Sequence, residues 1–232
     1  MRFELNITLR CNCACHNCNR LCHMKPDWAK DSDMTVFDVQ YFVLQLRMQG
    51  VIANRIKIVG GEPLVHPEFK EIMASLCVGA DAGLIKKIKI DSNGTLPRPD
   101  IPKHPAVHWS GRKPSRKAHL PTLWSPTDLG LQLHYPCSMP RVCGVSLDNR
   151  GYLPCSSAIS IVRTFGYEDQ YSDSIHGPWD MDKICKHCVF AAPKAWKDEH
   201  CLPLKDIPEE HKQPTKSWKE VLCNATNQRD QT

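Results

Sequence analysis

The chain begins with a regular alternation of hydrophobic and polar positions. Apolar residues occupy every second position from Phe3 to Leu9, and this period of two predicts a strand. From Thr35 to Gln49 the apolar residues follow helical spacing instead, and Gly50 supplies a stop signal. The first fifty residues therefore predict one strand followed by one helix.

The same alternation of elements is repeated in the next forty residues. A strand is predicted at 55–59, then a helix with Pro67 in its first turn and Gly79 at its end, then a strand at 85–90. A weaker strand is predicted at 107–110. Strand and helix in alternation are typical of a parallel α/β sheet. Such sheets bind ligands beyond the carboxyl ends of their strands.

Three polar loops follow the three clear strands directly. The first contains Cys11, Cys15 and Cys18 at C-x3-C-x2-C spacing. Cysteine thiolates are the usual protein ligands of iron–sulfur clusters, and three ligands would leave one iron of a four-iron cluster open. The second loop is Gly60-Gly61-Glu62-Pro63, and the third contains Ser92-Asn93-Gly94. For the third, an ordinary Asn-Gly turn is the alternative interpretation.

The cysteine spacing and the Gly-Gly-Glu-Pro motif, each at a strand end and in this order, resemble the radical S-adenosylmethionine (radical SAM) superfamily. The resemblance implies that the three cysteines bind a [4Fe-4S] cluster and that the motif formed by Gly60, Gly61, Glu62 and Pro63 contacts the amino group of SAM. It also implies that Ser92 and Asn93 help to hold SAM. One position departs from the family pattern, because Asn17 stands where an aromatic residue is usual.

The resemblance further implies a fold and a reaction. The fold would be a partial (β/α) barrel, shortened here because the sequence shows only three clear strand–helix units. The reaction would be reductive cleavage of SAM to methionine and a 5′-deoxyadenosyl radical, which abstracts hydrogen from a substrate. The substrate would be a peptide, a small molecule or a nucleotide precursor, and the partner a one-electron reductant such as flavodoxin or ferredoxin.

A zinc site is the alternative for the first cysteine loop. Zinc prefers four ligands in a closed tetrahedron, and further candidate ligands lie close in the sequence: Cys13, His16, Cys22 and His23. The corresponding function would be a non-catalytic interaction protein stapled by zinc or by a cluster. The intact Gly-Gly-Glu-Pro motif argues against this, because a structural staple needs no SAM-binding loop.

A second group of cysteines lies in the C-terminal half. Cys143 and Cys155 flank a predicted hairpin, and Cys185 and Cys188 form a C-x2-C pair. The arrangement partly resembles the SPASM and Twitch extensions, which carry auxiliary clusters. We therefore expect these four residues to bind a second, auxiliary [4Fe-4S] cluster. Two further cysteines are reserve ligands, Cys137 and Cys201, and a structural zinc site is the alternative.

These patterns suggest a division of the chain of 232 residues into a radical SAM core at 1–136, a Twitch-like extension at 137–205 and a polar, loose tail at 206–232. The basic segment 111–117 has two interpretations. It grips an anionic group of the substrate, or it is an ordinary solvated loop.

Composition indicates the cellular compartment and the class of partner. Thirteen cysteines without a recognisable signal peptide favour a reducing compartment and metal-bound thiolates, so we expect a cytoplasmic protein. No apolar run has the length of a membrane span, so no membrane association is expected. A net charge of +5 is too modest to indicate nucleic acid as a partner.

Overall fold

A single open sheet organises the molecule. The computed structural model describes residues 1–15, 17–111, 118–134, 137–203, 206 and 208–227. Six strands form the sheet in the order β4-β3-β2-β1-β6-β7. Their bounds are β1 (Arg2–Asn6), β2 (Arg55–Val59), β3 (Ile88–Ser92), β4 (Val107–Gly111), β6 (Val145–Asp148) and β7 (Gly151–Leu153). All neighbouring pairs are parallel except β6 and β7. The α/β prediction is confirmed, and the sheet does not close on itself.

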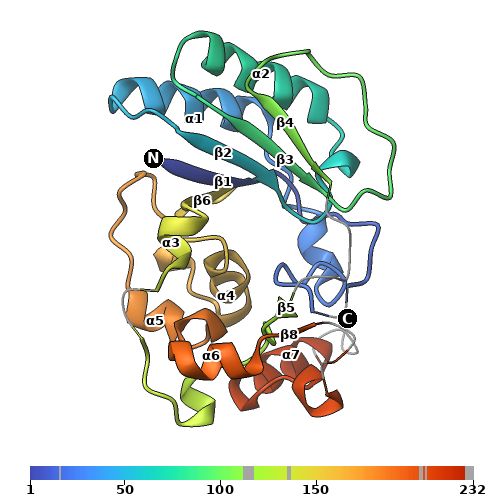
Figure 1. Cartoon of the computed structure of the whole chain (residues 1–232), viewed down its shortest axis with the longest axis vertical. Coiled ribbons are helices and arrows are strands. Elements are labelled where there is room, and N and C mark those ends of the chain that lie inside the picture. The colour runs from blue at the N-terminus through green and yellow to red at the C-terminus, as the bar shows by residue number, and fades with distance from the viewer. Residues whose placement is uncertain (16, 112–117, 135–136, 204–205, 207, 228–232) are drawn as a thin grey trace.

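Two long helices cover one face of the sheet (Figure 1). They are α1 (Val36–Met48) and α2 (Phe69–Asp81). Helix α1 begins where the sequence predicts, because the Thr35 side chain accepts a hydrogen bond from the Asp38 N–H and Asp38 bonds back to the Thr35 N–H. The apolar positions of β1, β2 and β3 face these helices and form the main hydrophobic core.

The predicted end of the second helix at Gly79 is wrong. Helix α2 continues through Gly79 to Asp81. A Cβ atom at this position would lie 2.7 Å from a methyl group of Ile85 and 3.1 Å from one of Val43. Gly79 therefore serves close packing of α2 against its neighbours, a function that sequence spacing does not reveal.

The opposite face of the sheet is polar. One rung across four adjacent parallel strands carries Glu4, Lys57, Lys89 and His108 in register. Burial falls along this rung, from the fully buried Glu4 to the exposed His108. Strands buried on both faces usually read as continuous apolar runs, so this row of charged residues is a distinct feature of the chain.

The C-terminal half packs below this polar face (Figure 1). The hairpin β6–β7 joins the edge of β1, and its residues Val145 and Leu147 enter the main core. The sheet thus runs across the expected boundary at residue 136. The other helices are α3 (Met139–Val142), α4 (Ala158–Phe165), α5 (Met181–Cys185), α6 (Lys194–His200) and α7 (Lys216–Asn227), and a two-stranded sheet pairs β5 (Ala118–His119) with β8 (Leu202–Pro203).

The expectation of a loose tail after residue 206 is wrong for the described residues. Helix α7 docks on the C-terminal half through Trp218, which is 2% exposed. The indole N–H donates to the His187 carbonyl at 3.0 Å, and the ring meets Phe165 edge-on. Trp218, Val221 and Leu222 stand at helical spacing, and Leu222 packs against the same core, so an apolar stripe anchors this segment.

We expect Trp218→Ala to lower the free energy of unfolding by about 3–5 kcal/mol, since it empties a packed aromatic site. Lys219→Ala is the matched control, because Lys219 is exposed on the same helix, and its effect should stay within about 0.5 kcal/mol. Urea unfolding followed by circular dichroism measures both. Equal midpoints for the two variants would restore the loose-tail interpretation.

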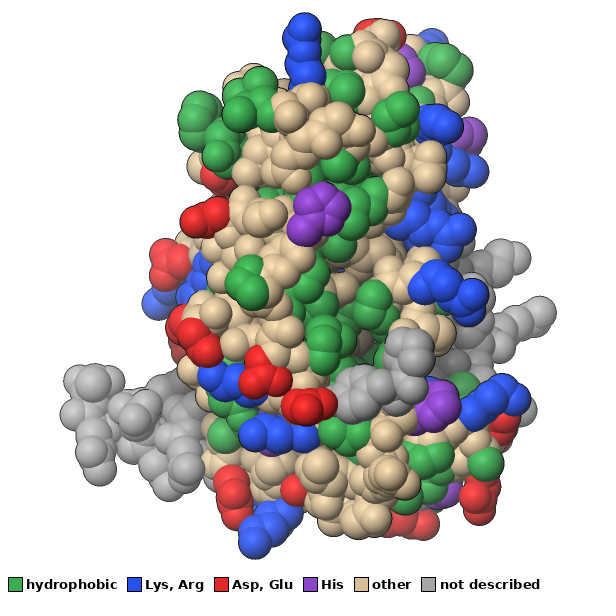
Figure 2. Space-filling model, turned by 90° about the vertical axis from the view of Figure 1, so that its left-hand side faces the viewer, with side chains coloured by type: hydrophobic (Ala, Val, Ile, Leu, Met, Phe, Trp, Pro, Cys, Tyr) green, Lys and Arg blue, Asp and Glu red, His purple; other side chains and the backbone are tan. Residues whose placement is uncertain are grey.

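The outer surface is mixed in character. On the side drawn in Figure 2, acidic and basic side chains both appear around hydrophobic ones that show between the two halves. No helix in the described ranges combines the length and the hydrophobicity that a membrane span requires.

Candidate functional site

The cysteine loop and the Gly-Gly-Glu-Pro loop are held together by their backbones. The pairing of β1 with β2 continues beyond both strands. The Ile7 N–H donates to the Val59 carbonyl at 3.0 Å, the Gly61 N–H to the Thr8 carbonyl at 2.8 Å, and the Glu62 N–H to the Arg10 carbonyl at 2.8 Å. The two motifs therefore meet at the carboxyl edge of the sheet, as the sequence predicts.

Both glycines of the second motif are required by this contact. A Cβ atom on Gly60 would lie 2.1 Å from the Thr8 carbonyl oxygen, and Gly60 also has a positive φ of 147°. A Cβ atom on Gly61 would lie 2.0 Å from the Arg10 carbonyl oxygen. The first role of the two glycines is thus to let the backbone approach the residues that lead into Cys11.

Gly61→Ala should separate the two loops. Because the new methyl group would meet fixed backbone, we expect a loss of about 3 kcal/mol in the free energy of unfolding. Gly50→Ala is the control, since Gly50 has a positive φ of 63° but open space around its Cβ position. It should cost only about 1 kcal/mol. Chemical denaturation that gives equal losses for both variants would contradict the close contact.

Glu62 connects the second loop to the third. Its side chain has no exposed surface. One carboxylate oxygen accepts the Leu64 N–H at 3.1 Å, and the other accepts the Asn93 N–H at 2.6 Å. The carboxylate that was expected to contact the SAM amino group is thus already engaged with the backbone of both loops.

Asn93 completes the junction of the three loops. Its side-chain amide donates to the Asn12 side-chain oxygen at 2.9 Å and lies 3.3 Å from the Cys13 sulfur. Its own oxygen accepts the Thr95 N–H at 2.9 Å. Ser92 has a different role, since its hydroxyl accepts the Gly94 N–H at 3.1 Å and shapes the turn. Asn93 therefore stabilises the turn of the third loop and also contacts the cysteine loop directly.

The loop cysteines are free thiols of unequal character. Cys15 is exposed, and Cys11, Cys13 and Cys18 are half-buried. Burial raises the pKa values of Cys11 and Cys15. A hydrogen bond from Cys22 lowers the pKa of Cys18 to about 5. Cys22, a candidate ligand only in the zinc interpretation, is thus a direct neighbour of the predicted cluster ligand Cys18.

The free thiols of the first cysteine loop are chemically suitable ligands for an iron–sulfur cluster. All cysteines of this loop are unbridged, and Cys11 is near enough to Cys13, Cys15 and Cys18 for their charges to raise its pKa. As they stand in the structure, no three Cys, His, Asp or Glu side chains within the described ranges are arranged to hold a metal ion. The thiols would have to close around a cluster on binding it.

The C-terminal cysteines form a second neighbourhood. Cys185 and Cys188 share a turn in which the Cys188 N–H donates to the Cys185 carbonyl at 3.0 Å. Burial raises the pKa of Cys155 to about 12, and the charges of Cys185 and Cys137 contribute. The Cys137 thiol donates to the Phe190 carbonyl at 3.4 Å, two residues beyond Cys188. The residues brought together here are Cys137, Cys155, Cys185 and Cys188.

Cys143 lies in different surroundings. Burial raises its pKa, and the charged side chains that act on it are Glu4, Lys57, Arg20 and Arg55. Cys137 is instead a cysteine whose charge would act on both Cys155 and Cys188. Cys201 ends α6 and is half-buried.

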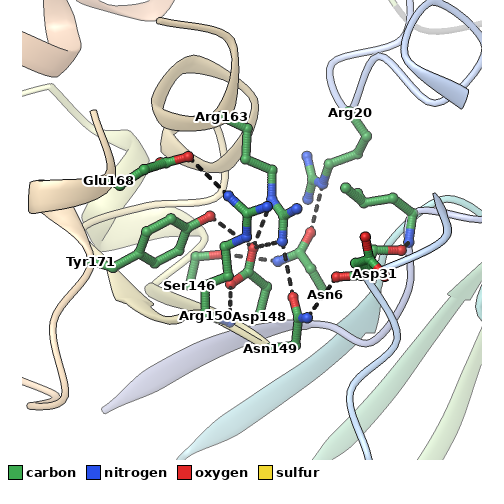
Figure 3. A network of polar contacts seen from close by, with 12 residues as sticks. Asn6, Arg20, Asp31, Ser146, Asp148, Asn149, Arg150, Arg163, Glu168 and Tyr171 are labelled. Atoms are coloured by element: carbon green, nitrogen blue, oxygen red, sulfur yellow. Dashed lines mark hydrogen bonds and ion pairs between the residues drawn. The ribbon is translucent and has the colours of Figure 1, made fainter. Parts of the chain in front are cut away.

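A buried polar layer between the two halves was not predicted as part of the site. Its first part surrounds Arg20, and its second part is the ion pair of Arg163 with Asp148 at 2.8 Å (Figure 3). The Tyr171 hydroxyl donates to the same Asp148 oxygen at 3.0 Å. The sequence did contain a sign of this layer. Strands β1 and β6 carry polar residues at alternate positions, which strands buried in a purely apolar core would not.

Two predicted features lie outside the described residues. These are His16, a candidate zinc ligand, and segment 112–117, which makes up most of the basic loop expected after β4.

Comparison with known proteins agrees with the resemblance to radical SAM enzymes. No family model matches the chain. Over 96 residues, or 40% of the chain, it is 33% identical to GTP 3′,8-cyclase 1 of Mycobacterium tuberculosis, in both strain CDC 1551 / Oshkosh and strain ATCC 25618 / H37Rv. The matched region covers 25% of the length of these relatives. GTP 3′,8-cyclase is a radical SAM enzyme, so this part of the chain has distant homology to the radical SAM superfamily.

Proposed function

We propose that the protein is a radical SAM enzyme that binds a [4Fe-4S] cluster through Cys11, Cys15 and Cys18. The observation that carries the proposal is the junction of three loops at one edge of a parallel sheet. The backbone of Gly61 and Glu62 is bonded to the residues leading into the cysteines, and Asn93 is bonded to both loops. A structural metal staple would not require this junction.

When bound, the cluster and SAM supply a reductive cleavage that gives methionine and a 5′-deoxyadenosyl radical able to abstract hydrogen. The chain's share is binding and orientation. The glycine backbone offers hydrogen-bonding groups to the methionine part of SAM, and Asn93 lies within reach of the same space. Glu62 acts mainly by fixing the two loops, because its carboxylate is buried and accepts two backbone N–H groups.

The C-terminal cysteines are proposed to form the auxiliary metal site. The ligand set we favour is Cys137, Cys155, Cys185 and Cys188, on the strength of their proximity. A four-iron cluster bound by four cysteines is our first choice, and structural zinc is the alternative. The substrate is proposed to be a small molecule or a peptide, and the electron donor a flavodoxin or ferredoxin in the cytoplasm.

Reductive cleavage of SAM tests the proposal. Anaerobically reconstituted protein with a strong one-electron reductant should release 5′-deoxyadenosine, even without substrate. Glu62→Gln should reduce this release by at least tenfold, because loss of the charge weakens the bonds that hold both loops. Its cysteines are untouched, so its iron content should stay near that of the parent protein.

Glu68→Gln is the matched control, since Glu68 precedes α2 and is exposed. It should cleave SAM at the parent rate. Intact SAM in every sample, together with an unchanged spectrum of the reduced cluster on SAM addition, would favour the stapled interaction protein. Zinc in place of iron at the first cysteine loop would also favour the stapled interaction protein.

A further inference from the structure

A buried arginine links the first cysteine loop to both halves of the molecule. Arg20 lies two residues after Cys18, and its side chain is 6% exposed. Its Nε donates to the Asn6 side-chain oxygen at 2.6 Å, and one terminal nitrogen donates to the Ser156 hydroxyl at 2.7 Å. Figure 3 shows the guanidinium directed at Asn6. Arg20 therefore joins the cysteine loop to β1 and to the turn that carries Cys155.

The backbone next to Arg20 is held in an unfavourable conformation. Leu21 is the one non-glycine residue with a positive φ, 56°, among those that the structure describes. Such a conformation costs about 1–2 kcal/mol and persists only where its surroundings enforce it. The Leu21 side chain is buried in the C-terminal core, and its N–H donates to the Cys18 carbonyl at 3.1 Å. The position of Cys18 is thus fixed from two sides.

The charge of Arg20 is balanced within a buried group of ionised side chains. Its nearest carboxylate oxygen is Oε1 of Glu4 at 3.6 Å. The same oxygen accepts a hydrogen bond from Lys57 at 2.8 Å, so Glu4 is shared between two cations. Burial works to raise the pKa of Glu4, but Arg20 and Lys57 hold it below its ordinary value. Lys57 also pairs with Asp91 at 3.0 Å, so two cations face two carboxylates in this buried layer. Arg20 is the cation that the cysteine loop itself carries, and in a buried layer its charge acts more strongly than in water.

We infer that Arg20 is a positioning residue of the N-terminal cysteine site, which holds Cys18 in place and stabilises the reduced state of a cluster bound there. The inference rests on the proposed function. Cluster potentials depend on net charge, hydrogen bonding and burial around the thiolates. A buried cation favours the added electron, so Arg20 makes the cluster easier to reduce. It also ties that site to the turn beside Cys155, which belongs to the second cysteine group.

The test compares the redox midpoint and the iron content of anaerobically reconstituted variants. The midpoint is read by electron paramagnetic resonance, from the signal that changes on SAM addition. Arg20→Gln should shift this midpoint to a more negative value and lower the retained iron. Arg20→Lys keeps the positive charge but loses the guanidinium hydrogen bonds to Asn6 and Ser156. This variant should therefore have the parent midpoint but retain less iron. Asn6→Ala should behave like Arg20→Lys, because it removes a partner and leaves the charge.

Arg163→Gln controls for the loss of any buried guanidinium, because Arg163 is equally buried and pairs with Asp148 in the second part of the polar layer. It should leave the midpoint unchanged. A midpoint for Arg20→Gln equal to that of the parent, or an equal shift in Arg163→Gln, would overturn the inference. If Arg20→Gln retains no cluster, a parent-like iron content in both Arg20→Lys and Asn6→Ala would overturn it. A parent protein that takes up no iron would instead refute the proposed function.

Discussion

Replacement of Cys11, Cys15 and Cys18 by Ala is expected to abolish reductive SAM cleavage and to remove about half of the bound iron. With two four-iron clusters the parent protein should hold about eight irons per chain. The three residues lie on the loop that Gly61 and Glu62 hold in place, at the junction where SAM is proposed to bind. The remaining iron should belong to the C-terminal cysteines.

The matched control is Cys77→Ala. Cys77 is a buried cysteine of α2 that packs in the main core, away from both cysteine groups. It should keep full iron content and SAM cleavage, because it contributes only packing. Iron and sulfide analysis with quantification of 5′-deoxyadenosine gives the result. SAM cleavage by the triple variant at the parent rate would exclude the loop as the reactive site.

The sequence alone predicts the elements that depend on local patterns. The strand at 55–59 is found with these bounds, and Thr35 caps α1 because capping depends on residues three positions apart. The meeting of the loops also follows from the parallel order of the strands, since their carboxyl ends share one edge. These features need no knowledge of distant contacts.

The features that the sequence does not predict depend on residues far apart in the chain. Gly79 lies inside its helix and not at its end, and glycine is needed there because Ile85 and Val43 leave no room for a side chain. Helix α7 is stabilised by tertiary packing, because Trp218 occupies a buried site against Phe165. Arg20 meets Ser156 across 136 positions of sequence, so its role has no local signature.

The ligands of the second cysteine group also depend on residues far apart in the chain. Their replacement gives the second large expected effect. Cys143 and Cys155 flank a hairpin, and sequence spacing alone favours them as a pair. In the structure the charged side chains that act on Cys143 are Glu4 and three basic residues, whereas Cys155 has the thiols of Cys185 and Cys137 in its surroundings. The expected ligand set therefore changes by one residue.

Cys137→Ala should lose the C-terminal metal and most of the stability of that half, while Cys143→Ala should retain both. Both cysteines are half-buried, so the two truncations are matched in lost packing. Removal of one thiolate from a four-ligand site weakens the metal, and metal binding by such a segment is coupled to its folding. Metal content and thermal unfolding of anaerobically purified protein measure the difference.

The same samples also show which metal the C-terminal cysteines bind. Loss of iron from Cys137→Ala would support an auxiliary cluster, and loss of zinc would support a structural site on the same four thiols. Retention of the metal by Cys137→Ala together with its loss from Cys143→Ala would restore the ligand set that flanks the hairpin. In that case the turn after β7 would have to rearrange on metal binding, because Cys155 lies beside Cys137 and Cys185 in the structure.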